Sequence, residues 1–123
     1  MEKLTPDNFK GTNSYQLSPD LNFAIHTYSS INTPPEYRII SIPDHKELRI
    51  LENNSDLIDA MSKMDRVPTE FFKVDIGNSV KLDGYIIKPP NIDETKKYPL
   101  FYYIYGEPAG QSVLDRWNGT RYF

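Results

Sequence analysis

Four short segments with the two-residue periodicity of β-strands occupy about forty residues near the start of this chain, and they constrain its fold most. In the clearest segment, residues 22–28, the side chains at alternate positions would face opposite sides of a half-buried strand. Turn residues precede it at Ser18-Pro19-Asp20. The predicted strands are residues 14–17, 22–28, 36–42 and 48–51. An antiparallel group of four short strands of this size is typical of one blade of a β-propeller.

A single blade is not expected to be stable by itself. Neighbouring blades cover its two sheet faces, and repeat units generally need about three copies or more for stability. No second copy of the four-strand pattern occurs in the 123 residues. The sequence therefore predicts that this chain is a piece of a larger protein.

A helical pattern begins at Asn53, after the fourth predicted strand, and Pro68 closes it. Its apolar side chains recur at helical spacing, which we interpret as packing against a core and not as a cofactor site. The residues of this stripe are Leu57, Ile58, Met61 and Met64.

Two further strands, residues 71–76 and residues 80–87, are predicted to form a hairpin around Gly77-Asn78. The continuous apolar run from Leu100 to Tyr105 is too short for a helix, and it predicts a strand buried on both faces, as in the middle of an α/β sheet. The predicted fold is thus mainly β, of the α+β class.

Charge and composition exclude several classes of protein. The chain has 14 Lys plus Arg and 17 Asp plus Glu, for a formal net charge of -3, and the two signs alternate without forming blocks. No electrostatic attraction to nucleic acid is therefore expected. The longest apolar run is far below the roughly 20 residues that cross a bilayer, and no apolar signal segment follows Met1. There is no Cys, which excludes a disulfide scaffold and leaves the compartment open.

The familiar catalytic motifs are incomplete in this stretch. Two sequences, ending at Ser79 and at Ser112, begin the G-x-S-x-G motif of a nucleophilic serine, but neither has the closing glycine. We interpret both serines as turn or loop residues. The two histidines precede both serines, the wrong order for an α/β-hydrolase triad, so we interpret His26 as packed or paired on a strand and His45 as a solvated turn residue. Two separated histidines without Cys predict no metal site.

One segment has the character of an oxyanion site. The predicted strand from Leu100 runs directly into Tyr105-Gly106-Glu107-Pro108. In α/β-hydrolases the loop after the third strand carries one half of the oxyanion hole, and a Tyr hydroxyl can serve as such a donor. The alternative interpretation of Tyr105 is a strand-end aromatic side chain packed under a turn.

Several motifs together resemble a known family. The motifs are Leu82-Asp83-Gly84-Tyr85, Lys96-Lys97-Tyr98-Pro99 and Tyr103-Ile104-Tyr105-Gly106-Glu107-Pro108. They resemble the junction between propeller and hydrolase in the prolyl oligopeptidase superfamily, and most of all its dipeptidyl peptidase IV family. Upstream, Ser18-Pro19-Asp20 and residues 27–35 and 49–54 are similar to the last propeller blade of the bacterial members. The resemblance extends from about Gly11 to Phe123.

This resemblance implies a domain organisation. Residues 1–53 would be the last β-propeller blade. Residues 54–123 would be the linking helix and the first strands of an α/β-hydrolase domain.

The resemblance also implies an activity for the parent protein, that of a serine exopeptidase that releases N-terminal Xaa-Pro or Xaa-Ala dipeptides from peptides without a metal or organic cofactor. The catalytic Ser, Asp and His of the family would lie after Phe123, and the glutamates that hold the substrate's amino group would lie before Met1. Tyr105 matches the Tyr whose hydroxyl helps to hold the oxyanion. The fragment alone would be inactive. If the source is bacterial, the resemblance implies a periplasmic or cell-envelope location.

Glu107 departs from the family pattern, which usually has Gly at this position. A carboxylate beside an oxyanion hole would repel the developing negative charge. Either the side chain of Glu107 points away from the hole, or the activity of the parent protein is altered.

Two alternatives to this assignment stay open. The chain could be a fragment of a sibling, such as an acylaminoacyl peptidase or another prolyl oligopeptidase-type enzyme. It could also be a free-standing β-rich module that uses its aromatic side chains to bind a peptide or a protein. In the fragment hypothesis, exposed strand edges and apolar faces predict that the isolated chain forms a homo-oligomer.

Overall fold

The computed structural model describes residues 3–104, 106–107 and 109–119, and the chain forms two compact units. Unit 1 combines the residues up to Met64 with the segment that begins at Asp115. Unit 2 consists of Asp65–Leu114. Each unit is described by itself below.

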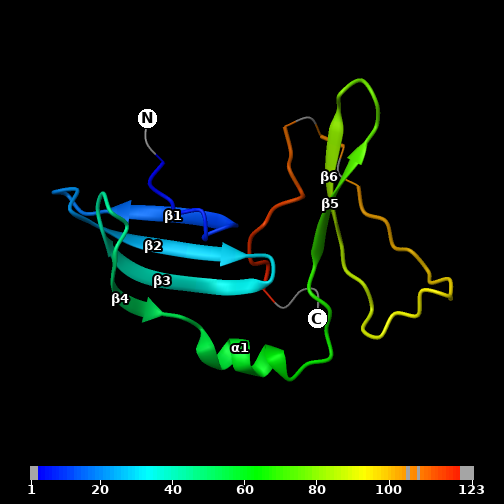
Figure 1. Ribbon diagram of the computed structural model, residues 1–123, viewed down its shortest axis with the longest axis horizontal. Helices are drawn as coiled ribbons and strands as arrows, with labels where there is room; N and C mark the ends of the chain where they lie inside the picture. Colours follow the sequence, from blue (N-terminus) through cyan, green and yellow to red (C-terminus); the bar gives the residue numbers. More distant parts are fainter. Residues whose placement is uncertain (1–2, 105, 108, 120–123) are drawn as a thin grey trace. The chain divides into compact units, whose positions relative to one another are not determined.

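Unit 1 is built on an antiparallel sheet with the strand order β1-β2-β3-β4 (Figure 1). The sheet confirms the four predicted strands, although their bounds differ by a few residues. They are β1 (Thr12–Leu17), β2 (Phe23–Ser30), β3 (Thr33–Ser41) and β4 (Glu47–Glu52).

The predicted start of the third strand at residue 36 is wrong, because Thr33, Pro34 and Pro35 already belong to β3. Ser30 pairs with Thr33, and Tyr28 pairs with Glu36, so the register shifts between the two pairs. Such an irregularity tolerates proline, since the residues beside it do not all donate to the ladder. The turn between β2 and β3 is therefore only two residues long, Ile31 and Asn32.

The two faces of this sheet differ in how well they are covered. Ala24, His26 and Ile40 are buried on one face. The neighbouring positions Phe23 and Ile25 alternate with them and belong to the other face, where both side chains are more than one-third exposed. The small core of unit 1 thus lies on one side of the sheet.

A single helix, α1 (Ser55–Ser62), follows β4. It confirms the helix predicted from Asn53, but it ends well before Pro68. The side-chain amide of Asn54, which precedes the helix, donates to the backbone oxygen of Pro35 at 2.5 Å and ties the helix start to β3. The predicted core packing holds for Met61, which is buried, whereas Ile58 and Met64 are exposed.

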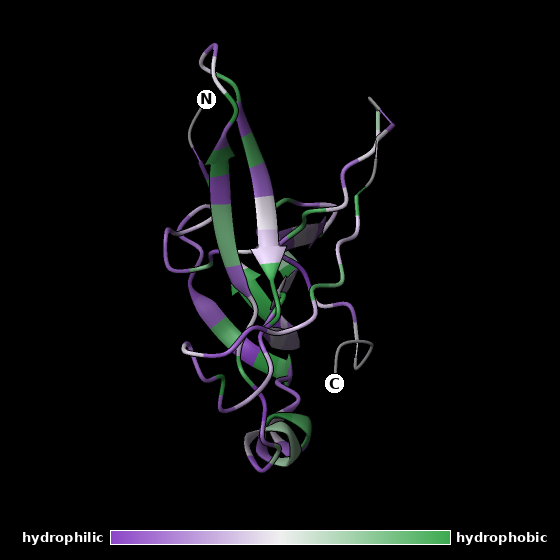
Figure 2. Cartoon of the chain, turned by 90° about the vertical axis from the view of Figure 1, so that its right-hand side faces the viewer, coloured by the Kyte–Doolittle hydropathy of each residue, from purple (hydrophilic) through white to green (hydrophobic). Residues whose placement is uncertain are grey.

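Unit 2 contains a hairpin of β5 (Glu70–Asp75) and β6 (Lys81–Ile86), which confirms the predicted pair of strands. Its turn uses left-handed backbone conformations at Gly77, Asn78 and Ser79. Apolar and polar residues alternate along both strands in Figure 2, yet no residue of β5 is buried. The hairpin therefore offers apolar side chains that the described residues leave uncovered.

The predicted strand from Leu100 is wrong for the residues that the structure describes. Residues 100–104 have no strand conformation, and their side chains are 70–90% exposed. A central strand forms only where neighbouring strands accept its hydrogen bonds on both sides. Within the described residues of unit 2, β5 and β6 pair only with each other.

No helix in the described part of the chain is long and apolar enough to cross a membrane.

Candidate functional site

The one predicted catalytic residue, Tyr105, lies outside the described residues. The described residues beside it show the start of a tight turn, because the backbone N–H of Gly110 donates to the carbonyl oxygen of Glu107 at 3.0 Å. The side chain of Glu107 is exposed. The backbone of Gly106 has space around it, since an added Cβ atom would meet nothing within 4 Å.

The two serines that begin incomplete nucleophile motifs occupy turn and loop positions, as predicted. Ser79 has a φ of 61° in the turn between β5 and β6. Ser112 is exposed in a segment without regular structure.

The two histidines meet two aromatic residues on the covered face of the unit 1 sheet. We call Phe9, Tyr15, His26 and His45 the aromatic–histidine cluster. Tyr15 pairs with His26 across β1 and β2, and their rings stack with centroids 4.7 Å apart and an interplanar angle of 10°. The rings of Phe9 and His45 meet the His26 ring edge-on at 5.0 Å and 4.8 Å. The cluster packs the segment before β1 and the turn after β3 onto the sheet.

His26 is held in one neutral form by its surroundings. Its Nε2 lies 2.8 Å from Oδ1 of Asn13. The amide of Asn13 in turn donates to the carbonyl oxygen of Phe9 at 2.9 Å, so its oxygen faces the ring and Nε2–H is the donor. Nδ1 is buried without a hydrogen-bond partner. Burial, assisted by the neighbouring His45 and Arg38, lowers the pKa of His26 from 6.5 to about 4.

The prediction for His26 is confirmed. His45 lies in a turn, as predicted, but it is half-buried and not fully solvated. His45 has a positive φ of 53° in the turn after β3, which directs its ring back over the sheet. Its Nε2 lies 3.0 Å from the hydroxyl of Tyr15, which also contacts Thr5 Oγ1 at 2.8 Å. No periodic pattern predicts this contact, because a turn residue belongs to no strand pattern.

Arg38 closes the cluster on the side of β3. Its guanidinium carbon lies 4.9 Å from the centre of the Phe9 ring, a cation–π contact. It forms ion pairs with Glu36 and with Glu47, the second at 3.0 Å. His26 is fully buried, so the cluster contributes to the core on this face of the sheet.

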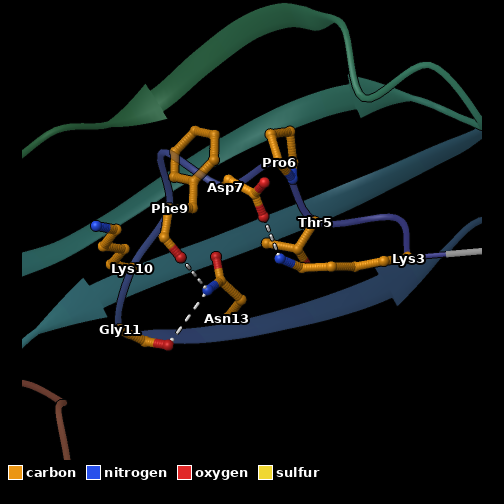
Figure 3. Close-up of a pocket in the computed structure, with 8 residues that line it drawn as sticks. All are labelled: Lys3, Thr5, Pro6, Asp7, Phe9, Lys10, Gly11 and Asn13. Carbon is orange, nitrogen blue, oxygen red and sulfur yellow. Dashed lines mark hydrogen bonds and ion pairs between the residues drawn. The ribbon is translucent and has the colours of Figure 1, made fainter.

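A shallow pocket of about 630 Å³ lies under the segment that precedes β1 (Figure 3). An exposed ion pair of Lys3 and Asp7, 2.6 Å long, borders it, and the hydrogen bond to Lys3 lowers the pKa of the Asp7 carboxyl. The lining residues are Lys3, Thr5, Pro6, Asp7, Phe9, Lys10, Gly11 and Asn13. They include no nucleophile paired with a base. Among the described residues, no group of three or more His, Cys, Asp or Glu side chains could hold a metal ion.

Comparison with known proteins shows that this chain is similar to one segment of dipeptidyl peptidases. No protein-family model matches it. It is 30% identical over 122 residues to a probable dipeptidyl-aminopeptidase B of Emericella nidulans, which covers 94% of this chain and 13% of that protein. It is 30% identical to human dipeptidyl peptidase 8, over 87% of this chain and 12% of that protein. Pig dipeptidyl peptidase 4 is 40% identical over 81 residues, 64% of this chain and 10% of that protein.

The structure agrees with these sequence similarities. It superposes on the crystal structure of Porphyromonas gingivalis dipeptidyl peptidase 4 with a TM-score of 0.80 and 33% identity, covering 89% of this chain and 16% of that one. The four-stranded antiparallel sheet, the short helix and the hairpin thus match one part of that dipeptidyl peptidase. The chain is homologous to a segment of the dipeptidyl peptidases, and it spans between 10% and 16% of the length of these relatives.

Proposed function

We propose that this chain is a segment of a serine dipeptidyl peptidase that releases Xaa-Pro or Xaa-Ala dipeptides from the N-termini of peptides. The observation that carries the proposal is the similarity to dipeptidyl peptidases over about nine-tenths of the chain, in sequence and in structure. Among the described residues the two histidines bond to Tyr15 and Asn13 and not to a serine, so in this proposal the catalytic triad is supplied by other parts of the parent protein.

The architecture of unit 1 supports a role as a propeller blade. Its four antiparallel strands follow one another in sequence order, and one face of the sheet stays exposed. Neighbouring blades cover such a face in a propeller. We therefore assign residues 1–53 to the last blade and residues 54–123 to the linking helix and the start of the hydrolase domain.

In this proposal Tyr105 donates its hydroxyl to the oxyanion of the tetrahedral intermediate. In this proposal the carboxylate of Glu107, which is exposed, points away from the hole, the first of the two possibilities for that residue. The parent protein would need neither a metal nor an organic cofactor for this chemistry.

The activity can be tested on the complete gene product that contains this chain. We expect release of p-nitroaniline from Gly-Pro-p-nitroanilide and no release from the same substrate with an acetylated amino group. Cleavage of the acetylated substrate would indicate an acylaminoacyl peptidase or another relative instead. No hydrolysis of either substrate would contradict the proposed function.

The role of Tyr105 has its own test in the same protein. Tyr105→Phe is expected to lower kcat by roughly 10²–10³ with little change in KM, as loss of one oxyanion donor does. Tyr103→Phe, which changes an exposed neighbour, is the matched control and is expected to keep the parental kcat. An unchanged kcat in Tyr105→Phe would remove this residue from the mechanism.

A further inference from the structure

The last described segment of the chain returns to the β2–β3 end of the unit 1 sheet. Oδ1 of Asp115 accepts a hydrogen bond from the backbone N–H of Ile31 at 2.8 Å, across 84 residues of sequence. The hydroxyl of Thr12, at the start of β1, donates to the backbone oxygen of Asp115 at 2.9 Å. In Figure 1 the red part of the chain lies beside this end of the sheet.

The β2–β3 turn explains why such a partner is needed. Two-residue hairpin turns usually have positive φ values, which match the twist of the strands. Neither Ile31 nor Asn32 has one. The side chain of Ile31 is only 7% exposed, so its amide lies where an unpaired donor would be unfavourable. A carboxylate satisfies that amide with a charge-assisted hydrogen bond.

The same segment is also held at a second point. The backbone N–H of Trp117 lies 3.5 Å from Oγ of Ser29, a long hydrogen bond. Asp115 and Trp117 are both partly buried, in contrast to residues 109–112 before them, which are exposed. The chain thus changes from an exposed loop to a segment held against the sheet just before Asp115.

The loop that leads to this anchor is the one assigned to the oxyanion hole. Tyr105 and Asp115 are ten residues apart in the sequence. We propose that Asp115 is a positioning residue, which fastens the end of the Tyr105 loop to the β2–β3 turn and so limits where the Tyr105 hydroxyl can lie during the reaction. This inference rests on the proposed function. In this inference Asp115, at the C-terminal end of the Tyr105 loop, touches neither the substrate nor the reacting atoms and acts only by holding the loop.

Kinetics of the full-length protein test this role. Asp115→Ala is expected to lower kcat about tenfold with little change in KM, because displacement of a catalytic group by an ångström costs on the order of 10²-fold and a loosened loop costs part of that. Asp115→Asn keeps an oxygen acceptor for the Ile31 amide and is expected to restore most of kcat. Asp93→Ala, which removes a half-exposed carboxylate of unit 2 that pairs with Lys96, is the matched control. A parental kcat in Asp115→Ala, or a kcat in Asp115→Asn as low as in Asp115→Ala, would overturn the proposal.

Hydrogen exchange separates this proposal from the proposed function. In the same full-length variants, the amide of Ile31 is expected to exchange at least about tenfold faster in Asp115→Ala than in the parent or in Asp115→Asn. Unchanged exchange would overturn the anchor even if the protein is an active peptidase. Faster exchange in a protein without peptidase activity would support the anchor and reject the function. If Asp115→Ala does not fold, Thr12→Val removes the second contact, and unchanged exchange and kcat in that variant would overturn the proposal.

Discussion

His26 is the residue whose chemistry depends most on its burial. Its folded-state pKa of about 4 lies below the ordinary value of 6.5, so the folded chain prefers the neutral imidazole. The neutral ring is surrounded by Phe9, Tyr15 and His45 and donates through Nε2 to Asn13. Protonation would place a charge beside the Arg38 guanidinium with no acceptor for Nδ1–H.

Stability should therefore depend on pH through this group. Below pH 6.5 His26 becomes protonated in the unfolded state but stays neutral in the folded state. The free energy of unfolding is therefore expected to fall as the pH decreases towards 4. The slope cannot exceed about 1.4 kcal/mol per pH unit for one group. Urea unfolding at several pH values measures it, and His26→Gln, which cannot titrate, should flatten the slope. An equally steep slope in that variant would contradict this role of His26.

The residue scale also shows the limits of prediction from sequence. His26 could be placed because it belongs to a strand with alternating side chains. His45 could not, because its position follows from a positive φ in a turn and from the arrival of the segment before β1. Asp115 was missed for a similar reason, since nothing near it in the sequence indicates a contact 84 residues away.

At the scale of the element, the start of β1 depends on one glycine. Gly11 has a φ of +132°, and a Cβ atom added there would lie 2.5 Å from the carbonyl oxygen of Ser29 on β2. Gly11→Ala would have to move two paired strands apart in addition to straining its own backbone.

We expect Gly11→Ala to lower the free energy of unfolding by roughly 1–3 kcal/mol or more, the usual range for backbone strain alone. Gly119→Ala is the matched control within unit 1, because Gly119 also has a positive φ of +72° but has nothing within 4 Å of an added Cβ. Chemical denaturation of both variants separates the cost of backbone strain, which both share, from the cost of the close approach to Ser29, which only Gly11→Ala has. Equal losses in the two variants would show that the close approach to Ser29 does not matter.

Elements that carry their own pattern were predicted well, and elements that depend on neighbours were not. The strands β1 to β4 and the hairpin follow from alternation and turn residues within each segment. The start of β3 is predicted too late because the sequence does not show the shifted register that accommodates its two prolines. The run from Leu100 has the composition of a central strand, but composition supplies no partner strands.

At the scale of the whole molecule, much apolar surface lacks a cover. On β5 and β6 the exposed side chains include Phe72, Val74 and Leu82. The open face of the unit 1 sheet adds Phe23 and Ile25. Exposed apolar faces and unpaired strand edges favour association with another chain.

We therefore predict that the isolated chain forms a dimer or a larger homo-oligomer. Light scattering at several micromolar concentrations measures its mass. Ile25→Lys places a charge on the open face of the sheet and is expected to weaken an association that uses this face. A monodisperse monomer across this concentration range would contradict the prediction.

The candidate site is predicted from motif similarity, and this kind of evidence names a single residue, Tyr105, without the groups around it. Tyr105 could be named because the residues around it match a family pattern. The distances that would define an oxyanion hole depend on groups outside this stretch, and a short pattern encodes none of them. The sequence thus predicts which residue acts, whereas the surrounding architecture decides where it lies.

The return of Asp115 to the β2–β3 turn gives the chain the topology of an insertion, with all of unit 2 between two parts of unit 1. During synthesis, the sheet is complete some sixty residues before its final contact leaves the ribosome. Closing a flexible loop of that length would cost about 4 kcal/mol in chain entropy. This cost is larger than the stabilisation that two hydrogen bonds contribute. The contact between Asp115 and the β2–β3 turn is therefore expected to form last, after the four strands have paired.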